Sequence, residues 1–249
     1  MSITKWDTSF LRGAEPKARS PRKRALIILN QPFSIPLLKS LWASTEWHCC
    51  ADGGANRLSD VLGEARRELL PELIKGDLDS LRDDVRGYYE SVGVPVVYDG
   101  DQYSTDLMKC VSALEEKERA EGTEQHDIII LGGLSGRLDQ TVHTLSYLHK
   151  LRHKRQRVFA VTDENVGWVL DEGEHEITID HSVLGQTCGL LPVGIDSTVL
   201  TTRGLRWNLT EHESSFDGLV STSNHLDPEH DIVYVKTTKP IWWTAELRS

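Results

Sequence analysis

Cysteine motifs, long apolar runs and an excess of basic residues are all missing from this sequence. Its 249 residues include only four cysteines, and no two form a C-x-x-C pair, so a zinc site has little support. No apolar run approaches the ~20 residues that cross a bilayer, and the N-terminal segment lacks the apolar core of a secretory signal. The net charge of −10 argues against binding to nucleic acid. We therefore expect no membrane and no nucleic-acid partner, and unpaired thiols favour a cytoplasmic location.

Familiar phosphate-binding motifs are missing too. No G-x-x-x-x-G-K-[ST] occurs, which excludes a Walker-type site, and the glycines of "GGLSG" lack the G-x-G-x-x-G spacing of dinucleotide-binding folds. The acidic segment that begins at Asp77 has neither the glycine nor the closing glutamate of an EF-hand loop. Any phosphate or metal site must therefore be of another kind.

The order of apolar and polar segments predicts two domains. From Arg24, short aliphatic runs such as "RALIILN" and "HDIIIL" alternate with helical patterns as far as about Asn165, which indicates an α/β fold with a doubly wound, mostly parallel sheet. After that point the chain consists of short β-rich pieces with frequent turns, typical of an all-β sandwich. We expect a flexible N-terminal tail over residues 1–23, an α/β domain over 24–166 and a β-sandwich domain over 167–249.

Two helices of the α/β domain have recognisable starts. Ser80-Leu-Arg-Asp83 fits a capping box and predicts a helix that ends near Val92. A second helix is expected from Asp106 to about Ala120, with Ser104 or Thr105 as its cap. Both starts directly follow polar, acidic turns.

Two carboxylates follow an apolar segment in "LIKGDLDS". Asp77 and Asp79 are two residues apart, so in an extended chain both side chains point to the same face. Like charges held together need a shared proton, an arginine or a divalent cation. Carboxylate oxygens suit Mg²⁺, which takes its other ligands from water and phosphate. The alternative is a solvated turn in which Asp79 or Ser80 only caps the next helix.

Three further strand ends have a similar character. Asp52 precedes Gly53 and Gly54, where the main chain can approach a phosphate. The other two ends carry polar clusters, namely Asp101, Gln102, Ser104, Thr105 and Asp106 at one, and Gly132, Gly133, Gly136, Arg137 and Asp139 at the other. Because ligands of such folds lie outside the carboxyl ends of the strands, we expect the four turns to converge. Arg137 offers a guanidinium fork that suits phosphate oxygens, and the negative cluster calls for a metal.

Seven motifs occur in a specific order from about Ala25 to the C-terminus. They are "ADGGANRL", "GDLDS", "DQYSTD", "GGLSGRLDQ", "RGLRWNLT", "LVSTSN" and "KPIWWTAEL". Together they resemble thiamine pyrophosphokinase of the eukaryotic, fungal type. The resemblance implies an enzyme that transfers the pyrophosphoryl group of ATP to the hydroxyl group of thiamine without a covalent intermediate, giving thiamine diphosphate and AMP. It also implies a homodimer that holds thiamine near the subunit interface.

The resemblance gives roles to the residues at the strand ends. It places Mg²⁺ on the carboxylates of Asp52, Asp77, Asp79 and Asp106, with ATP as the co-substrate. Asp106 is the expected acceptor of the hydroxyl proton, with Asp139 as its rival, and Arg137 neutralises phosphate charge. The expected ATP-binding residues are Asp52, Gly53, Gly54, Gln102, Thr105, Gly133, Ser135 and Arg137.

Thiamine has a cationic ring and a flat aminopyrimidine, which favour aromatic faces and a few hydrogen bonds. The resemblance places Trp243 in this pocket, with Ser221 and Asn224 at the pyrimidine edge. Adjacent side chains in "PIWW" point to opposite faces of a strand, so at most one of the two tryptophans faces the ligand. Trp207 is a further candidate, although it can equally be a core residue.

Two other functions stay open on the sequence. A D-x-D nucleotide-sugar glycosyltransferase would explain "GDLDS" but not the other three turns. A non-catalytic sensor of thiamine or nucleotide would keep the pocket, although binding alone does not require every carboxylate. Mg²⁺-dependent turnover distinguishes the sensor from the enzyme.

Overall fold

The computed structural model describes residues 3–13 and 22–248, which fall into two compact units. Arg12–Gly136 forms an α/β unit, and the rest of the described chain forms a β-rich unit. The expected combination of a parallel sheet with a β-rich second part is confirmed. No helix within the described ranges is both long and apolar enough to cross a membrane.

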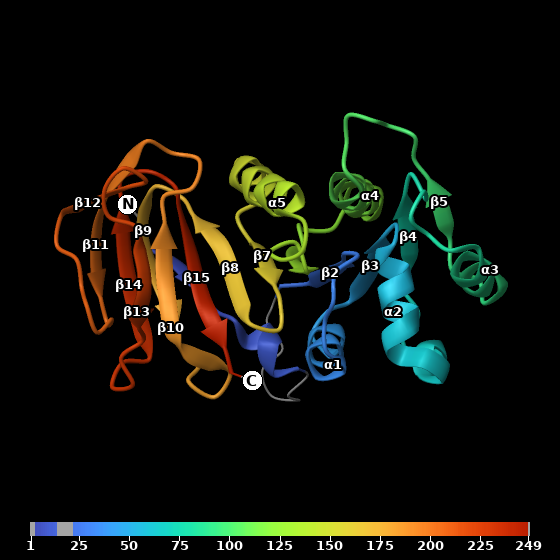
Figure 1. Ribbon diagram of the computed structural model, residues 1–249, viewed down its shortest axis with the longest axis horizontal. Coiled ribbons are helices and arrows are strands. Elements are labelled where there is room, and N and C mark those ends of the chain that lie inside the picture. Colours follow the sequence, from blue (N-terminus) through green and yellow to red (C-terminus); the bar gives the residue numbers. More distant parts are fainter. Residues whose placement is uncertain (1–2, 14–21, 249) are drawn as a thin grey trace. The chain divides into compact units, whose positions relative to one another are not determined.

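A parallel sheet forms the centre of the α/β unit (Figure 1). Its strands are β2 (Arg24–Ile28), β3 (Trp47–Ala51), β4 (Leu73–Gly76), β5 (Val96–Tyr98) and β6 (Asp127–Leu131). They lie in the order β6-β2-β3-β4-β5, and each neighbouring pair is parallel. Every residue of β2, β3 and β6 is buried, which explains why these strands are mainly continuous apolar runs in the sequence.

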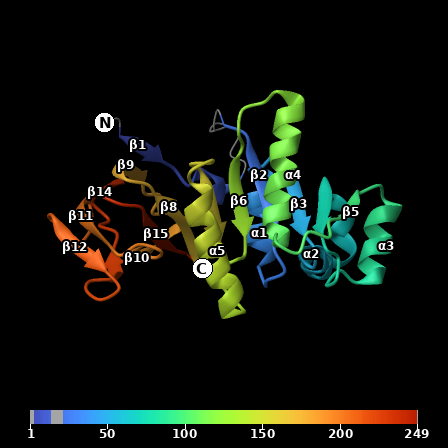
Figure 2. The same ribbon diagram turned by 90° about the horizontal axis from the view of Figure 1, so that it is seen from above.

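Four α-helices connect these strands, and they are α1 (Ile35–Ala43), α2 (Gly54–Leu62), α3 (Asp83–Ser91) and α4 (Asp106–Glu121); the 3-10 helix η2 (Gly63–Glu68) follows α2. Helices α1 and α2 cover one face of the sheet and α4 covers the other, so the sheet is doubly wound (Figures 1 and 2). The helix predicted from Asp106 is confirmed, and it ends at Gly122 in the left-handed conformation (φ 63°).

The capping box predicted at Ser80 is wrong. Helix α3 has Arg82 as its N-cap residue, and no side chain caps it. Ser80 is engaged elsewhere, because its main-chain N–H donates to Asp52 Oδ2 (3.1 Å) and its hydroxyl donates to Asp79 Oδ1 (2.9 Å). The serine therefore stabilises the acidic turn and not the helix.

Close packing explains the two glycines that follow Asp52. A Cβ atom on Gly54 would lie 2.2 Å from the carbonyl oxygen of Ile28, and one on Gly53 would lie 2.4 Å from Asn30 Nδ2. The start of α2 thus approaches the end of β2 more closely than any residue with a side chain allows. Packing against the main chain therefore requires glycine at position 54, whereas at position 53 the close contact is with the side chain of Asn30.

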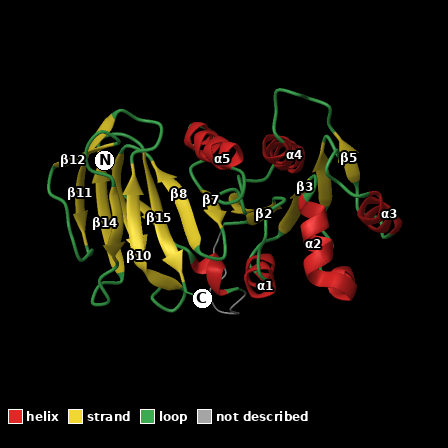
Figure 3. Cartoon of the chain, viewed as in Figure 1, coloured by secondary structure: helices red, strands yellow, loops and turns green. Residues whose placement is uncertain are grey.

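The β-rich unit contains two sheets (Figure 3). One has the strand order β1-β9-β14-β11-β12 and the other includes the order β13-β10-β15-β8-β7. The strands are β1 (Thr4–Trp6), β7 (Val158–Val161), β8 (Asn165–Leu170), β9 (Gly173–Thr178), β10 (Leu184–Leu191), β11 (Ser197–Arg203), β12 (His212–Ser215), β13 (Ser221–His225), β14 (Ile232–Thr237) and β15 (Ile241–Leu247). The rings of Trp6 on β1 and Trp168 on β8 lie 5.6 Å apart, so the two sheets pack face to face as a sandwich.

The N-terminal segment differs from the flexible tail that we expected over residues 1–23. Strand β1 pairs in parallel with β9 (Figure 2), and the 3-10 helix η1 (Ser9–Arg12) follows it. Trp6 is buried and its Nε1–H donates to His175 Nδ1 (3.0 Å), while Phe10 packs on Phe159 at 4.9 Å. Aromatic residues in an otherwise polar segment were the available sign of this docking. Residues 1–2 and 14–21 of the expected tail lie outside the described ranges.

The boundary between the two units also differs from the expected one at residues 166 and 167. Helix α5 (Leu138–Leu151) and strands β7 and β8 group with the β-rich unit, whose C-terminal part begins at Arg137. Helix α5 lies against β8, and β7 pairs antiparallel with β8. The alternation of apolar and polar segments predicted helices and strands as far as about Asn165, but it cannot tell which core each element joins.

Candidate active site

Three carboxylates from three strand ends meet at the edge of the parallel sheet. Asp52 follows β3, Asp77 follows β4, and Asp106 begins α4 after the loop that leaves β5. One carboxylate oxygen of each residue lies within 4.8 Å of the others. Asp52 is buried, whereas the side chains of Asp77 and Asp106 are 31% and 27% exposed. Of the four turns that we expect to converge, these three agree with this geometry.

Asp52 is held in an unusual conformation and has one unsatisfied oxygen. Its φ of 44° lies in the left-handed region, where aspartate is better tolerated than most residues. Oδ2 accepts the main-chain N–H of Ser80 (3.1 Å), while Oδ1 is buried and has no hydrogen-bond partner among the described residues. Burial raises the pKa of the Asp52 carboxyl, the hydrogen bond from Ser80 opposes this, and the charge of Asp106 adds to it. A cation beside Oδ1 would favour the ionised form.

Asp106 links the acidic turn to helix α4. Its Oδ1 accepts the main-chain N–H of Asp77 (3.2 Å) and the ammonium group of Lys109 (3.0 Å). Lys109 Nζ also lies 4.0 Å from Asp77 Oδ2. Two of the three carboxylates therefore share one buried lysine.

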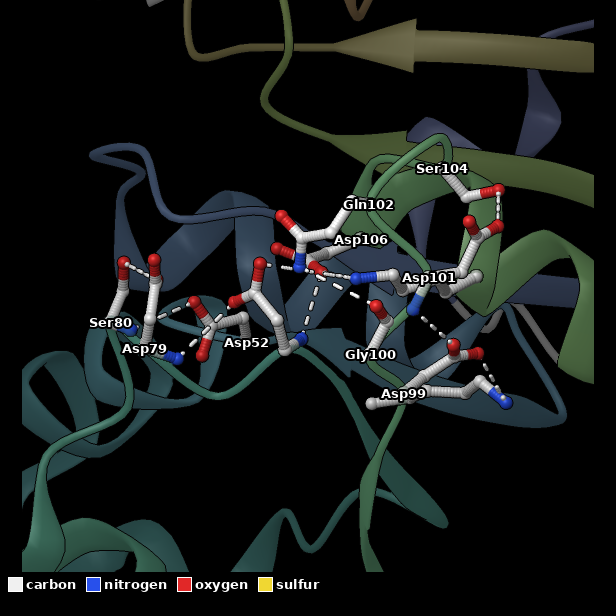
Figure 4. A network of polar contacts seen from close by, with 12 residues as sticks. Asp52, Asp79, Ser80, Asp99, Gly100, Asp101, Gln102, Ser104 and Asp106 are labelled. Atoms are coloured by element: carbon white, nitrogen blue, oxygen red, sulfur yellow. Dashed lines mark hydrogen bonds and ion pairs between the residues drawn. The ribbon is translucent and has the colours of Figure 1, made fainter.

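Asp79, the second carboxylate of the D-x-D motif, does not join the three. Leu78 has a φ of 59°, so the chain is not extended between the two aspartates and the same-face expectation is wrong. The Asp79 N–H donates to Asp77 Oδ1 (3.2 Å), and the Asp79 carboxylate accepts the Ser80 hydroxyl (Figure 4). Asp79 instead fixes the shape of the turn.

The loop that precedes Asp106 is built from successive aspartate turns (Figure 4). Asp99 Oδ1 accepts the Asp101 N–H (3.2 Å) and Asp99 Oδ2 pairs with Lys75 Nζ (3.3 Å). Asp101 in turn accepts the Tyr103 N–H (2.9 Å) and the Ser104 hydroxyl (2.6 Å). These hydrogen bonds fix the course of the loop up to the N-terminus of α4 and so position Asp106.

Gln102 and Thr105, which we expect to bind ATP, lie in or next to this loop. The Gln102 side chain is exposed, and its Nε2 reaches only the Gly100 carbonyl at 3.5 Å. Thr105 is the N-cap residue of α4, yet its hydroxyl makes no capping bond and is buried without a hydrogen-bond partner among the described residues. Both polar groups are thus uncommitted.

The glycine-rich turn after β6 is closed by a residue that the sequence analysis overlooked. Gln31 Oε1 accepts the main-chain N–H of Gly133 (2.8 Å) and the hydroxyl of Ser135 (2.9 Å). Gly132, Gly133 and Gly136 have φ values of 105°, 88° and 78°, which favour glycine. The turn is therefore shaped by its own conformation and by Gln31.

Arg137 and Asp139 belong to the β-rich unit and pair with each other. Arg137 Nε lies 3.1 Å from Asp139 Oδ1, and the two side chains are 73% and 64% exposed. This ion pair is the contact that the structure assigns to both groups. The expected roles of Arg137 at phosphate and of Asp139 as a base stay predictions.

The residues expected to bind thiamine differ in accessibility. Trp243 is fully buried and packs on Trp168 at 6.4 Å, so it is a core residue here, and its neighbour Trp242 is buried as well. Trp207 is 52% exposed, with its ring 4.9 Å from the His225 ring. Asn224 holds the Trp207 main chain through two hydrogen bonds, from the Trp207 N–H (3.2 Å) and to its carbonyl (2.8 Å). Ser221 is buried in β13.

A divalent cation fits the three carboxylates. They supply oxygen ligands from separate elements, and one buried oxygen of Asp52 has no partner. Gly76 allows them to approach, because a Cβ atom there would lie 2.8 Å from Asp52 Cβ and 2.9 Å from Asp106 Oδ1. Asn56 steadies the turn, since its side chain donates to the Ser80 carbonyl (2.7 Å) and accepts the Arg82 N–H (3.1 Å).

Lys109, Gln31 and Asn56 were not singled out from the sequence. Lys109 carried the clearest signal, because it lies three residues after Asp106 on a helix, where the two side chains meet. Gln31 and Asn56 contact partners that are distant in sequence, 102 and 24 residues away, and spacing cannot reveal such pairs.

Comparisons with known proteins point to one family. The family model described as "Thiamin pyrophosphokinase, catalytic domain" matches residues 38–160, and "Thiamin pyrophosphokinase, vitamin B1 binding domain" matches residues 174–242. The chain is 37% identical over 237 residues to thiamine pyrophosphokinase 3 of Oryza sativa subsp. japonica. The aligned region covers 90% of this chain and 87% of the rice protein.

Solved structures agree with this relationship. Thiamin pyrophosphokinase from Candida albicans superposes with a TM-score of 0.86 at 25% identity and covers 99% of this chain and 93% of its own. Yeast thiamin pyrophosphokinase superposes with a TM-score of 0.85 at 27% identity, and the match covers 100% of this chain and 92% of the yeast chain. On the strength of both family models and of the near full-length similarity, the chain belongs to the thiamine pyrophosphokinase family.

Proposed function

We propose that this protein is a Mg²⁺-dependent thiamine pyrophosphokinase that transfers the pyrophosphoryl group of ATP to the hydroxyl group of thiamine and releases AMP. The observation that carries the proposal is the meeting of Asp52, Asp77 and Asp106 in a chain of this family. These three residues would hold the metal ion. Bound Mg²⁺ would screen the charge of the triphosphate and of the departing AMP.

The main contribution of the chain is to position charged groups around the β-phosphorus of ATP. Asp52, Asp77 and Asp106 would hold the metal ion, and the Asp106 carboxylate accepts the proton of the thiamine hydroxyl as the new P–O bond forms. The Asp106 carboxylate is restrained for this by Lys109 and by the Asp77 N–H. Gln102 and Thr105 contribute their uncommitted polar groups to ATP.

Phosphate contacts are also proposed for two other parts of the chain. The glycine turn at Gly133 and Ser135 offers a shaped main chain to ATP, as do Gly53 and Gly54 at the start of α2. Among the described residues, Arg137 pairs with the exposed carboxylate of Asp139, and exposed ion pairs contribute little, so phosphate can replace Asp139 as its partner.

We assign the thiamine pocket to the β-rich unit. The exposed ring of Trp207 is the best placed aromatic face for a cationic ligand, and Asn224 fixes its main chain. Trp243 contributes from the core and not by direct contact, because its side chain is fully buried.

A homodimer and a cytoplasmic location complete the proposal. The homodimer is proposed from the resemblance to the family, and the β-rich unit has exposed apolar side chains that an interface can cover, among them Trp207, Phe216 and Ile232. All four cysteines are buried free thiols, as expected in a reducing compartment. The comparisons support neither a D-x-D glycosyltransferase nor a non-catalytic sensor.

The reaction is tested by product analysis. The protein is mixed with thiamine, ATP and Mg²⁺, and the products are separated by chromatography. Equal amounts of AMP and thiamine diphosphate are expected, and omission of Mg²⁺ should abolish both. ADP with thiamine monophosphate would mean transfer of the γ-phosphoryl group. No product from protein that still binds ATP and thiamine would contradict the enzymatic assignment.

A further inference from the structure

Lys109 is a buried cation beside the acidic site. Its side chain is only 2% exposed, although lysine is rarely buried without a partner. The ammonium group lies 3.0 Å from Asp106 Oδ1 and 4.0 Å from Asp77 Oδ2. The ammonium group is thus ion-paired with these carboxylates and counts as a fixed positive charge of the cluster.

The ammonium group of Lys109 is directed at the carboxylates. Its side chain is 2% exposed, and Nζ donates to Asp106 Oδ1. We therefore expect Lys109 to act on the reaction through the carboxylates. Lys75 offers a useful comparison, because it forms a similar pair with Asp99 (3.3 Å), a residue outside the three-carboxylate group.

The charges of the group leave room for one divalent cation. Three carboxylates against one buried ammonium leave two negative charges, which one divalent ion neutralises. We propose that Lys109 is a positioning residue that acts as a built-in counter-cation: it holds Asp106 in place through Oδ1 and limits the site to a single, exchangeable divalent ion. This inference rests on the proposed function, because it takes the three carboxylates as the metal ligands.

The proposal predicts that removal of the lysine charge strengthens metal binding. Replacing Lys109 by methionine keeps most of the apolar stem and leaves three carboxylates without a fixed cation. Mn²⁺, the probe, should then bind at least about tenfold more tightly in the absence of nucleotide, because the attraction of the site for a cation grows. Turnover with Mg²⁺ should fall at least about tenfold, because Asp106 loses its restraint. A residue with only a structural role would not raise metal affinity.

The experiment is Mn²⁺ binding measured by electron paramagnetic resonance and by calorimetry. Wild type is expected to bind one Mn²⁺ ion. Lys109→Met is expected to bind its first Mn²⁺ ion more tightly than wild type does and then to bind a second ion. Lys109→Arg retains the charge and should bind Mn²⁺ as wild type does. Lys75→Met is the matched control, and its affinity should stay within about twofold of wild type because its partner Asp99 lies outside the group.

Two outcomes would overturn the inference. One is an unchanged or weaker Mn²⁺ affinity of folded Lys109→Met, and the other is an equal gain in affinity for Lys75→Met. If Lys109→Met does not fold, the double variant Lys109→Met with Asp106→Asn restores the charge balance; it should fold and bind one Mn²⁺, and failure of either counts against the proposal. Absence of Mn²⁺ binding by wild type would instead contradict the metal site of the proposed function, and this inference would fall with it.

Discussion

Replacing Asp106 by asparagine is expected to reduce turnover about a thousandfold or more, within the range observed for loss of a general base. Asparagine has nearly the same shape but can neither accept the proton of the hydroxyl group nor provide a carboxylate to a metal. It also weakens the contact with Lys109 Nζ, which lies 3.0 Å from the native carboxylate. Steady-state kinetics should show the loss mainly in kcat, while ATP affinity changes far less.

Asp101 provides the control for this substitution. It lies in the same loop, but its contacts are to the Tyr103 N–H and the Ser104 hydroxyl, and an asparagine Oδ1 can still accept the first of them. Asp101→Asn should therefore keep turnover within about tenfold of wild type. Full activity of Asp106→Asn would remove this residue from the chemistry, and an equal loss in both variants would indicate a general effect of the loop.

Replacing Gly76 by alanine is expected to separate the carboxylates. The new Cβ atom would lie 2.8 Å from Asp52 Cβ and 2.9 Å from Asp106 Oδ1, so at least one of them must move. Misplacement of reacting groups by about 1 Å can cost a hundredfold in rate, and overpacking of this kind costs about 1–3 kcal/mol in stability. We expect both effects, measured as kcat and as the free energy of unfolding in urea.

Gly87 is the matched glycine for comparison. It lies within α3, and nothing would be within 4 Å of a Cβ atom at this position. Gly87→Ala should keep full activity and gain about 0.5–1 kcal/mol in stability, because alanine favours the helix. If Gly76→Ala retains wild-type activity, the close approach of the three carboxylates is not needed for the reaction.

The sequence was a good guide to the strand ends and a poor guide to the side chains that follow them. Asp52, Asp77 and Asp106 could be predicted to meet, because parallel strands of one sheet end at a common edge. Asp79 could not be placed correctly, since the left-handed Leu78 (φ 59°) breaks the alternation on which the prediction depended. A leucine gives no sign of that conformation.

The domain limits show a similar division. The aliphatic run "HDIIIL" correctly indicated the buried strand β6, but the helix α5 that follows it belongs to the β-rich unit together with Arg137. The short strand β1 was missed because three residues, Thr4–Trp6, carry too little pattern. Their pairing with β9 joins residues about 170 positions apart, which only the folded chain reveals.

The fully buried Trp243 illustrates a limit of motif transfer. The resemblance assigned it to the ligand, yet its side chain packs on Trp168 in the core of the β-rich unit. A motif does not record how exposed a side chain is. The exposed side chain of Trp207 is the better candidate for contact with thiamine.

The most direct measurement of the central claim is anomalous diffraction from crystals of the wild-type protein soaked in Mn²⁺. The account predicts one strong peak at about 2.0–2.4 Å from oxygens of Asp52, Asp77 and Asp106, with no Asp79 oxygen at that distance. A peak held by Asp79 in place of Asp52, or the absence of a peak at this sheet edge from protein that is active with Mn²⁺, would contradict it.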